Sequence, residues 1–303
     1  MIPLIIIAGW LGSGKTTLLQ NLLNEVGRNF RIAVIQNEFA PSGVDSRQLE
    51  GGTTPFRLLE INNGSVFCVC QLPNFLKALK HLALEYQPDY IFLESSGLAD
   101  PINIAEIMQS DEIAGLVGLR TIITLIDGKN FFRTVKVLPR FRHQVMVADH
   151  LIINKQDITP EKEIEKIRDT VSEWNPFSAI TITSFCRIDL VRILGSHETD
   201  MKRLQALMGI KSGGQPSIHV SVLKNHNSIQ PDHCQKFVKD LSGECSRLKG
   251  FVKLTDGTAM AVQTIYEEVN LKVVPGYNGP TELIIFSDTL RARELNERFK
   301  LYV

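Results

Sequence analysis

The sequence predicts an α/β fold, with a mostly parallel sheet flanked by helices and a second, smaller α+β domain. Short runs rich in β-branched residues alternate with helical patterns through the first two thirds of the chain, which is typical of a parallel sheet with crossover helices. Several of these runs are apolar throughout, as expected for strands buried on both faces. After about residue 195 a polar, glycine-bearing stretch precedes a new set of strands. We therefore expect a first domain at 1–195, a linker at 196–216 and a second domain at 217–303.

The individual elements follow from these runs in chain order. In the first domain we expect strands at 3–9, 31–37, 90–95, 121–127 and 150–154, and helices at about 15–27, 73–86, 101–109, 139–148 and 160–173. Pro73, Pro101 and Pro160 stand near the starts of three of these helices, where the missing N–H of proline costs nothing. In the second domain we expect strands within 217–223, 247–255, 258–269 and 281–287, and helices near 232–243 and 289–300.

Composition and charge exclude several classes of function. Lys plus Arg and Asp plus Glu both number 33, so no excess charge indicates a nucleic acid or an anionic membrane as partner. The apolar start, MIPLIIIAGW, lacks a basic leader and is expected to be a buried strand rather than a signal peptide. No run approaches the ~18 apolar residues of a membrane span. Five cysteines, an odd number, do not indicate a secreted disulfide scaffold, and a cytoplasmic location is expected.

Residues 9–16, GWLGSGKT, fit the phosphate-binding pattern G-x-x-x-x-G-K-[ST] between an expected strand and an expected helix. The glycines let backbone N–H groups turn toward phosphate oxygens, and the helix N-terminus favours negative charge. Lys15 is expected to reach the β- and γ-phosphates, and the Thr16 hydroxyl to bind Mg²⁺. The residues expected to contact the nucleotide here are Gly9, Gly12, Ser13, Gly14, Lys15, Thr16 and Thr17. The pattern predicts a P-loop NTPase; the alternative is a glycine-rich turn that binds nothing.

A base-recognition sequence, Asn154-Lys155-Gln156-Asp157, stands at the end of the strand expected at 150–154. Asp157 can accept from N1–H and the 2-amino group of guanine, whereas adenine has neither donor and would leave the carboxylate unpaired. Asn154 can address the other edge of the base, and the stem of Lys155 can lie against its face. The alternative is that these four residues form a polar turn that caps a helix. The nucleotide interpretation predicts GTP.

The strand expected at 90–95 delivers Glu94 to its C-terminal end, where P-loop proteins hold Mg²⁺, often through water. Gly97 can bring a backbone N–H to the γ-phosphate. Position 98 is Leu, where Ras-type proteins place the glutamine that orients the attacking water. Slow hydrolysis is therefore expected, with the missing group supplied by a partner, a metal or a second subunit.

The loop after the second expected strand, from Asn37 to Asp45, is placed to act as a nucleotide-sensing switch. Glu38 and Asp45 are its candidate metal ligands. The alternative is an ordinary surface loop with acidic residues.

Cys68 and Cys70 stand one residue apart, so in an extended segment both side chains would point to the same face. Three interpretations are open. The thiolates could bind Zn²⁺ or Co²⁺ together with further ligands from the switch loop, a histidine or a second subunit. They could form a strained disulfide, or they could be packing residues that alternate with Phe67 and Val69.

Taken together, these motifs resemble the CobW-type GTPases, from the group that contains the urease and hydrogenase nickel-insertion GTPases. The resemblance rests on GWLGSGKTTLL, NEF…GVD, EINNG, ESSGLADP, QVMVADHLIINKQD and KGFVKLTDG. It implies a GTP-hydrolysing metallochaperone whose nucleotide state gates the binding or delivery of Zn²⁺ or Co²⁺. It also implies a client metalloprotein or a cobalamin-pathway enzyme as partner. A homodimer that meets near the nucleotide would supply the missing water-orienting group.

The sequence departs from the family pattern at three places. The family loop reads N-G-C-x-C-C, whereas this chain has Ser65, Phe67 and Cys68 at the three cysteine positions. Its seven histidines are scattered rather than gathered in a tract, and Pro41-Ser42 replaces a common acidic residue. The altered cysteines and the missing histidine tract favour an alternative, a GTP-dependent chaperone that reactivates a corrinoid or metal enzyme without carrying metal. A P-loop small-molecule kinase is a further alternative, against which the N-K-x-D sequence argues.

Overall fold

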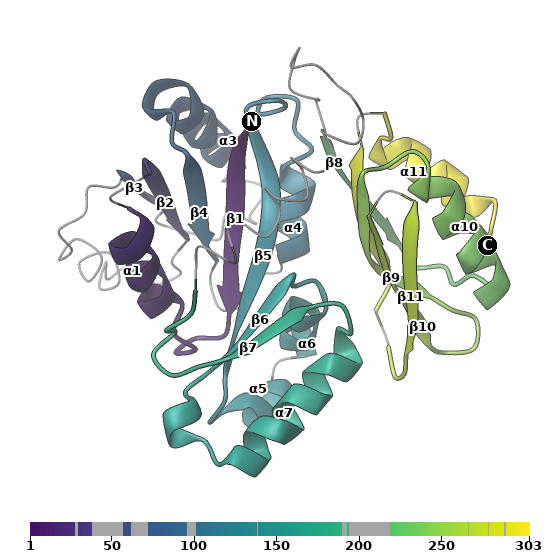
Figure 1. Cartoon of the computed structure of the whole chain (residues 1–303). Helices are drawn as coiled ribbons and strands as arrows, with labels where there is room; N and C mark the ends of the chain where they lie inside the picture. The colour runs from purple at the N-terminus through teal and green to yellow at the C-terminus, as the bar shows by residue number, and fades with distance from the viewer. Residues whose placement is uncertain are drawn as a thin grey trace.

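Two β-sheets organise the part of the chain that the computed structural model describes (Figure 1). The described residues are 1–27, 30–37, 57–61, 72–95, 101–137, 139–189, 193, 219–265, 267–277, 279–287 and 289–303. The first sheet uses strands from residues 2–182, and the second uses strands from residues 219–287. None of the described helices is long and apolar enough to cross a membrane.

Within the described ranges the first sheet has seven strands in the order β3-β2-β4-β1-β5-β6-β7, and every neighbouring pair is parallel. Its strands are β1 (Ile2–Gly9), β2 (Ile32–Asn37), β3 (Arg57–Ile61), β4 (Tyr90–Glu94), β5 (Val117–Asp127), β6 (His150–Asn154) and β7 (Ala179–Ile182). Its α-helices are α1 (Lys15–Val26), α3 (Leu72–His81), α4 (Pro101–Ile107), α5 (Phe131–Val137), α6 (Pro139–Met146) and α7 (Glu161–Trp174). The predicted α/β fold with a mostly parallel sheet is thereby confirmed.

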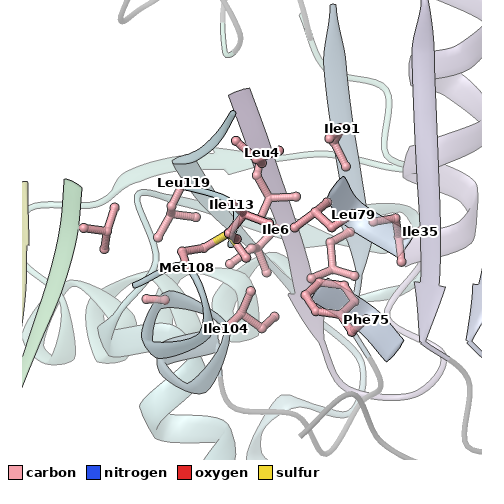
Figure 2. Packing of buried hydrophobic residues seen from close by; sticks show 14 of the residues in the cluster. Leu4, Ile6, Ile35, Phe75, Leu79, Ile91, Ile104, Met108, Ile113 and Leu119 are labelled. Atoms are coloured by element: carbon pink, nitrogen blue, oxygen red, sulfur yellow. The ribbon is translucent and has the colours of Figure 1, made fainter. Parts of the chain in front are cut away.

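Both faces of this sheet are buried, which explains why its strands are apolar throughout. On β1, Leu4 and Ile6 face one hydrophobic cluster, while Ile5 and Ile7 face another. The cluster around Leu4 and Ile6 includes residues of α3 and of the segment around α4, as Figure 2 shows. The opposite cluster packs against the leucines of α1. Helices therefore cover both faces, and the ends of the strands are left to form a site.

The second sheet has five strands in the order β11-β10-β9-β12-β8, and every neighbouring pair is antiparallel. Its strands are β8 (His219–Asn225), β9 (Arg247–Lys253), β10 (Ala259–Ile265), β11 (Glu268–Val274) and β12 (Thr281–Ser287). Helices α10 (Pro231–Ser242) and α11 (Ala292–Lys300) cover one face (Figure 1). The other face packs against the first domain, because Val222 and Ile284 join the cluster that contains Ile104 of α4.

Several sequence expectations need correction. The single strand expected at 258–269 is two strands, since β10 ends at Ile265 and antiparallel β11 begins at Glu268. Strand β11 was not predicted as a separate strand. It lies at the edge of the sheet, is polar at alternate positions and is largely exposed, so its sequence gives a weak strand signal. The edge strands β3 and β7, and the short helix α5, were not predicted either. The helix expected at 73–86 ends at His81 and continues as a π-helical turn over Leu82–Tyr86.

Candidate nucleotide site

The candidate site lies at one edge of the first sheet, where parallel strands end side by side. Strand β1 lies between β4 and β5, and β6 is the next neighbour of β5. The register pairs Ile7 with Glu94, and it pairs Asp127 with Asn154. The phosphate-binding, acidic and base-recognition sequences therefore reach the same edge, as is general for ligand sites in open α/β sheets.

The phosphate loop has a backbone that only glycine adopts easily. Gly9, Gly12 and Gly14 have φ angles of 136°, 75° and 109°. A Cβ atom on Gly9 would lie 2.5 Å from the Leu125 carbonyl oxygen, and one on Gly14 would lie 2.6 Å from Asn154 Nδ2. Side chains at these two positions would therefore collide with the neighbouring strands.

Helix α1 begins directly after this loop with its N-terminus uncapped. Gly14 is the N-cap residue, no side chain caps the helix, and its first turn contains no acidic residue. Its first N–H groups thus have no side-chain acceptor from the N-cap, which suits an anion. Thr16 and Thr17 belong to this first turn. The buried ammonium of Lys15 donates to the Gly9 carbonyl oxygen at 2.9 Å, which holds it over the loop.

Two candidate oxygen ligands converge beside the loop. Thr16 Oγ1 donates to Glu94 Oε1 at 3.3 Å, although 78 residues separate the two in sequence. The other carboxylate oxygen of Glu94 accepts from Gln36 Nε2 at 2.8 Å. Gln36 was not predicted as a site residue; its signal is a polar side chain that follows four buried apolar residues near the C-terminal end of a strand. A hydroxyl and a carboxylate are ligands that Mg²⁺ prefers, so the pair fits that ion.

Asn154 links the base-recognition sequence to the phosphate loop. Its Nδ2 donates to the Ser13 carbonyl oxygen at 2.9 Å, and its Oδ1 accepts from the Cys186 N–H at 3.0 Å. Asn154 is only 3% exposed. The amide expected to address an edge of the base is therefore engaged on both polar atoms by the protein itself.

Lys155 and Asp157 follow in a tight turn that begins the short 3₁₀ segment Gln156–Ile158. Lys155 has a left-handed backbone, with φ at 68°, and its Nζ lies 2.7 Å from Asp127 Oδ2. This ion pair fixes the lysine stem across the end of β5. The Asp157 N–H donates to Ser184 Oγ at 3.0 Å, while its side chain remains exposed and open to a ligand.

The loop after β7 is a part of the site that sequence reasoning missed. Phe185 and Cys186 both have left-handed backbones, with φ at 55° and 53°, a strain that is common at functional sites. Asn21 of α1 donates to both of their carbonyl oxygens, at 2.9 and 3.0 Å. The thiol of Cys186 lies 3.4 Å from the Gly14 carbonyl oxygen, and burial raises its pKa to about 12. Strand β7 was not predicted, so nothing in the sequence placed this loop beside the base-recognition turn.

Asp127 is a second site residue that was not predicted from the sequence. It ends β5 as Glu94 ends β4, after a run of apolar residues. The same signal that selected Glu94 could have selected Asp127. Its carboxylate accepts from Lys155 and from the backbone and side chain of Asn130.

The remaining predicted site residues, Glu38, Asp45, Cys68, Cys70 and Gly97, lie outside the described residues. Within the described ranges, no group of three or more His, Cys, Asp or Glu side chains is arranged to hold a metal ion. The three described cysteines are buried, and burial raises the pKa of the Cys234 and Cys245 thiols to about 12 and 11.

Comparison with known proteins decides the family. A family model for the CobW/HypB/UreG nucleotide-binding domain matches residues 3–181. The chain belongs to the CobW/HypB/UreG family. The match spans the phosphate loop, Glu94 and the base-recognition sequence, and it confirms the resemblance inferred from the motifs.

Two curated relatives are similar to this CobW/HypB/UreG chain. A zinc-regulated GTPase metalloprotein activator of Saccharomyces cerevisiae is 30% identical over 240 residues, covering 70% of this chain and 55% of the relative. A zinc chaperone CobW of a Sinorhizobium species is 29% identical over 200 residues, covering 56% of this chain and 55% of the relative. The chain thus spans about half the length of the curated relatives that it matches.

Among solved structures, the Zn(II)-bound YjiA GTPase of E. coli has a similar fold. The TM-score is 0.52 at 18% identity, over 100% of this chain and 99% of that one. At this identity the likeness establishes the fold alone, including the second sheet.

Proposed function

We propose that this CobW/HypB/UreG chain binds and slowly hydrolyses GTP and uses its nucleotide state to gate the binding or delivery of a transition metal. The observation that supports this most directly is the hydrogen bond from Asn154 Nδ2 to the Ser13 carbonyl oxygen at 2.9 Å. It joins a phosphate loop to a base-recognition turn 141 residues later in the chain, so one guanine nucleotide can occupy both. Family membership and the names of the curated relatives support the same proposal.

In this proposal the loop from Gly9 to Thr17 holds the phosphates. Its backbone N–H groups and Lys15 stabilise the charge that develops during phosphoryl transfer. Gly97 adds a backbone N–H to the γ-phosphate. Asp157 selects guanine, and the stem of Lys155, fixed by Asp127, lies against the base. Asn154 holds the two halves of the site together.

Thr16 and Glu94 would hold Mg²⁺, with Glu38 and Asp45 as further candidates from the switch loop. The ion neutralises phosphate charge and polarises the phosphoryl group when bound. Gln36 keeps the Glu94 carboxylate turned toward Thr16, so the two oxygens are in place before the nucleotide binds.

Zn²⁺ is the proposed metal cargo, with Co²⁺ as the second candidate, and Cys68 and Cys70 are the proposed ligands. The printed names of the relatives favour zinc, and thiolates suit either ion. A client metalloprotein or cobalamin-pathway enzyme would receive the metal in the cytoplasm. A homodimer would supply the group that orients water.

One specific observation favours a second candidate function. Ser65 and Phe67 stand where the family pattern has cysteines, which leaves two thiols in the loop. The chain would then act as a GTP-dependent chaperone of a metal or corrinoid enzyme without binding metal itself.

Nucleotide competition tests the nucleotide part of the proposal. Unlabelled GTP should displace a fluorescent GDP analogue at least about 100-fold better than ATP, because adenine leaves Asp157 unpaired. ITP, which lacks the 2-amino group, should fall between them, and Asp157→Ala should narrow the gap between GTP and ITP. Equal competition by ATP would contradict the assignment.

Metal binding separates the two candidate functions. Equilibrium titration with Zn²⁺ and Co²⁺ should show that Cys68→Ser/Cys70→Ser binds at least ten times more weakly than the wild-type chain. Cys245→Ala is the matched control, since that thiol is buried in the second domain, and it should bind as the wild type does. If the double variant keeps full affinity while GTP turnover is normal, the chaperone without metal is the better description.

A further inference from the structure

A cavity of about 190 Å³ lies between the two domains, apart from the nucleotide site. It is many times larger than the ~10–15 Å³ that one water molecule needs. One wall comes from the end of α6 and the start of β6, and the other comes from β9, β10 and β12. Since His150 begins β6 and Asn154 ends it, the cavity lies at the opposite end of that strand from the base-recognition turn.

Asp149 lines the cavity, and its two carboxylate oxygens already accept hydrogen bonds from four donors. Oδ2 accepts from the Ile122 N–H at 2.8 Å and from Thr121 Oγ1 at 3.3 Å. Oδ1 accepts from Arg247 Nη2 at 2.5 Å and from Lys249 Nζ at 2.7 Å. Asp149 therefore holds two cations of β9 with a single negative charge.

The other buried carboxylate in the wall does not balance this excess. Glu282 pairs with Lys224, at 3.1 Å, and with His143. Glu282 is therefore engaged by partners other than Arg247 and Lys249, which share the single carboxylate of Asp149. Burial lowers the pKa of His150, which favours its neutral form at neutral pH. With Lys249 protonated, Arg247 and Lys249 together carry one positive charge more than Asp149 balances, and a buried charge is costly unless it is paired.

Arg247 and Lys249 also keep donors for a ligand. An arginine side chain has five N–H donors. Among the described residues, the Arg247 side chain makes one hydrogen bond, to Asp149. Its guanidinium lies over the ring of Phe286, 5.6 Å from the centroid, which fixes the direction of the fork. Lys249 Nζ uses two of its three protons, on Asp149 and on the Val147 carbonyl oxygen at 3.1 Å. Burial and, to a smaller extent, Arg247 lower the pKa of Lys249 to about 8 against the opposing effect of Asp149, so Lys249 stays mostly protonated at pH 7.

We propose that this cavity binds a small oxyanion, a carboxylate or a phosphate, held by Arg247 and Lys249. The guanidinium fork matches two oxygens of one oxyanion, and the added negative charge balances the cluster. The anion would lie where β9 meets the first domain, because both cations also contact Asp149, the residue before β6. The cavity shares no residue with the nucleotide site, so anion binding can be tested independently of GTP binding.

Calorimetric titration of the full chain tests the proposal. The chain is first saturated with Mg²⁺ and a non-hydrolysable GTP analogue, so that the phosphate loop and the γ-phosphate position are filled. Sodium phosphate, sodium acetate and sodium chloride are then titrated separately at matched ionic strength and pH 7. We expect one equivalent of phosphate or acetate to bind per chain, and the stronger of the two identifies the class of ligand.

Variants separate the cavity from other sites. Arg247→Gln should weaken the binding at least tenfold. Arg293→Gln is the control, since Arg293 is an exposed arginine paired with Glu297 at 3.3 Å, and it should leave the binding unchanged. Arg247→Lys keeps the charge beside Asp149 but removes the fork, so it should fold and still bind several-fold more weakly. The proposal is wrong if neither anion binds better than chloride, or if Arg247→Lys and Arg293→Gln both bind as the wild type does.

Discussion

Asn154 Nδ2 donates to the Ser13 carbonyl oxygen at 2.9 Å, and this bond holds the end of β6 against the turn before α1. The same side chain accepts from the Cys186 N–H at 3.0 Å. Three loops of the candidate site are thus joined through one buried amide, which acts on the shape of the site rather than on one edge of the base.

Asn154→Ala should therefore loosen the whole site. Two buried hydrogen bonds are lost, and the free energy of unfolding should fall by about 1–3 kcal/mol. GDP affinity should fall at least tenfold, measured with a fluorescent GDP analogue. Asn175→Ala is the control, because Asn175 also makes two buried bonds, to the Val145 and Ala148 carbonyl oxygens. It should lose similar stability but keep GDP affinity; equal loss of affinity in both variants would contradict the role of Asn154.

Gly14→Ala should abolish tight nucleotide binding. The new Cβ would lie 2.6 Å from Asn154 Nδ2 and 3.0 Å from Cys186 Sγ, at a φ of 109°. The comparison is Gly12→Ala, at a φ of 75° but with no atom within 4 Å of the new Cβ. Fluorescence titration with a GDP analogue should show a much larger loss for Gly14→Ala than for Gly12→Ala. Equal losses would mean that backbone strain alone, without the contact to Asn154, accounts for the effect.

Gln36→Ala should raise the Mg²⁺ concentration needed for GTP hydrolysis. The variant removes the donor that holds Glu94 Oε2 at 2.8 Å, and with it one of the contacts that keep the carboxylate turned toward Thr16. We expect half-maximal activity to require several-fold more Mg²⁺, with little change at saturating Mg²⁺. Gln144→Ala serves as control, since Gln144 is a buried glutamine of α6. Unchanged Mg²⁺ dependence in Gln36→Ala would remove Gln36 from the site.

Asp149→Asn should destabilise the chain by about 3–5 kcal/mol, because it leaves the buried Lys249 and the half-buried Arg247 without their carboxylate. Burial alone would raise the pKa of Asp149, but Arg247, Lys249 and the hydrogen bonds that it accepts hold that pKa well below its usual value. Its contribution is therefore complete above the unfolded pKa of about 3.9 and is lost as the pH falls below that value.

Urea denaturation between pH 7 and pH 3 measures this effect. The difference in unfolding free energy between wild type and Asp149→Asn should shrink as the pH falls below about 4. Asp169→Asn is the control, because its side chain is 75% exposed, and it should stay within about 0.5 kcal/mol of wild type throughout. A difference that does not depend on pH would show that Asp149 acts by shape rather than by charge.

The fold could be predicted where strands are buried and helices amphipathic, and it could not where edges are exposed. Strands β1, β4 and β6 have continuous apolar runs, whereas β7 is a four-residue edge strand that is only partly buried. The site follows the same rule. Sequence spacing placed Thr16 and Glu94 at one sheet edge, and the structure brings their oxygens within 3.3 Å. The contribution of Cys186 depends on β7 and on a left-handed backbone, neither of which a single sequence displays.

The burial of β12 has a consequence for how the chain melts. Every residue of β12 is buried, since Leu283 and Ile285 contact the cluster under α10 and α11 while Ile284 and Phe286 contact the first domain. Cutting the chain between the two sheets would expose both apolar surfaces to water. We expect the intact chain to lose both sheets in one cooperative thermal transition, and a fragment that ends near residue 195 to aggregate rather than persist as a soluble GTPase domain.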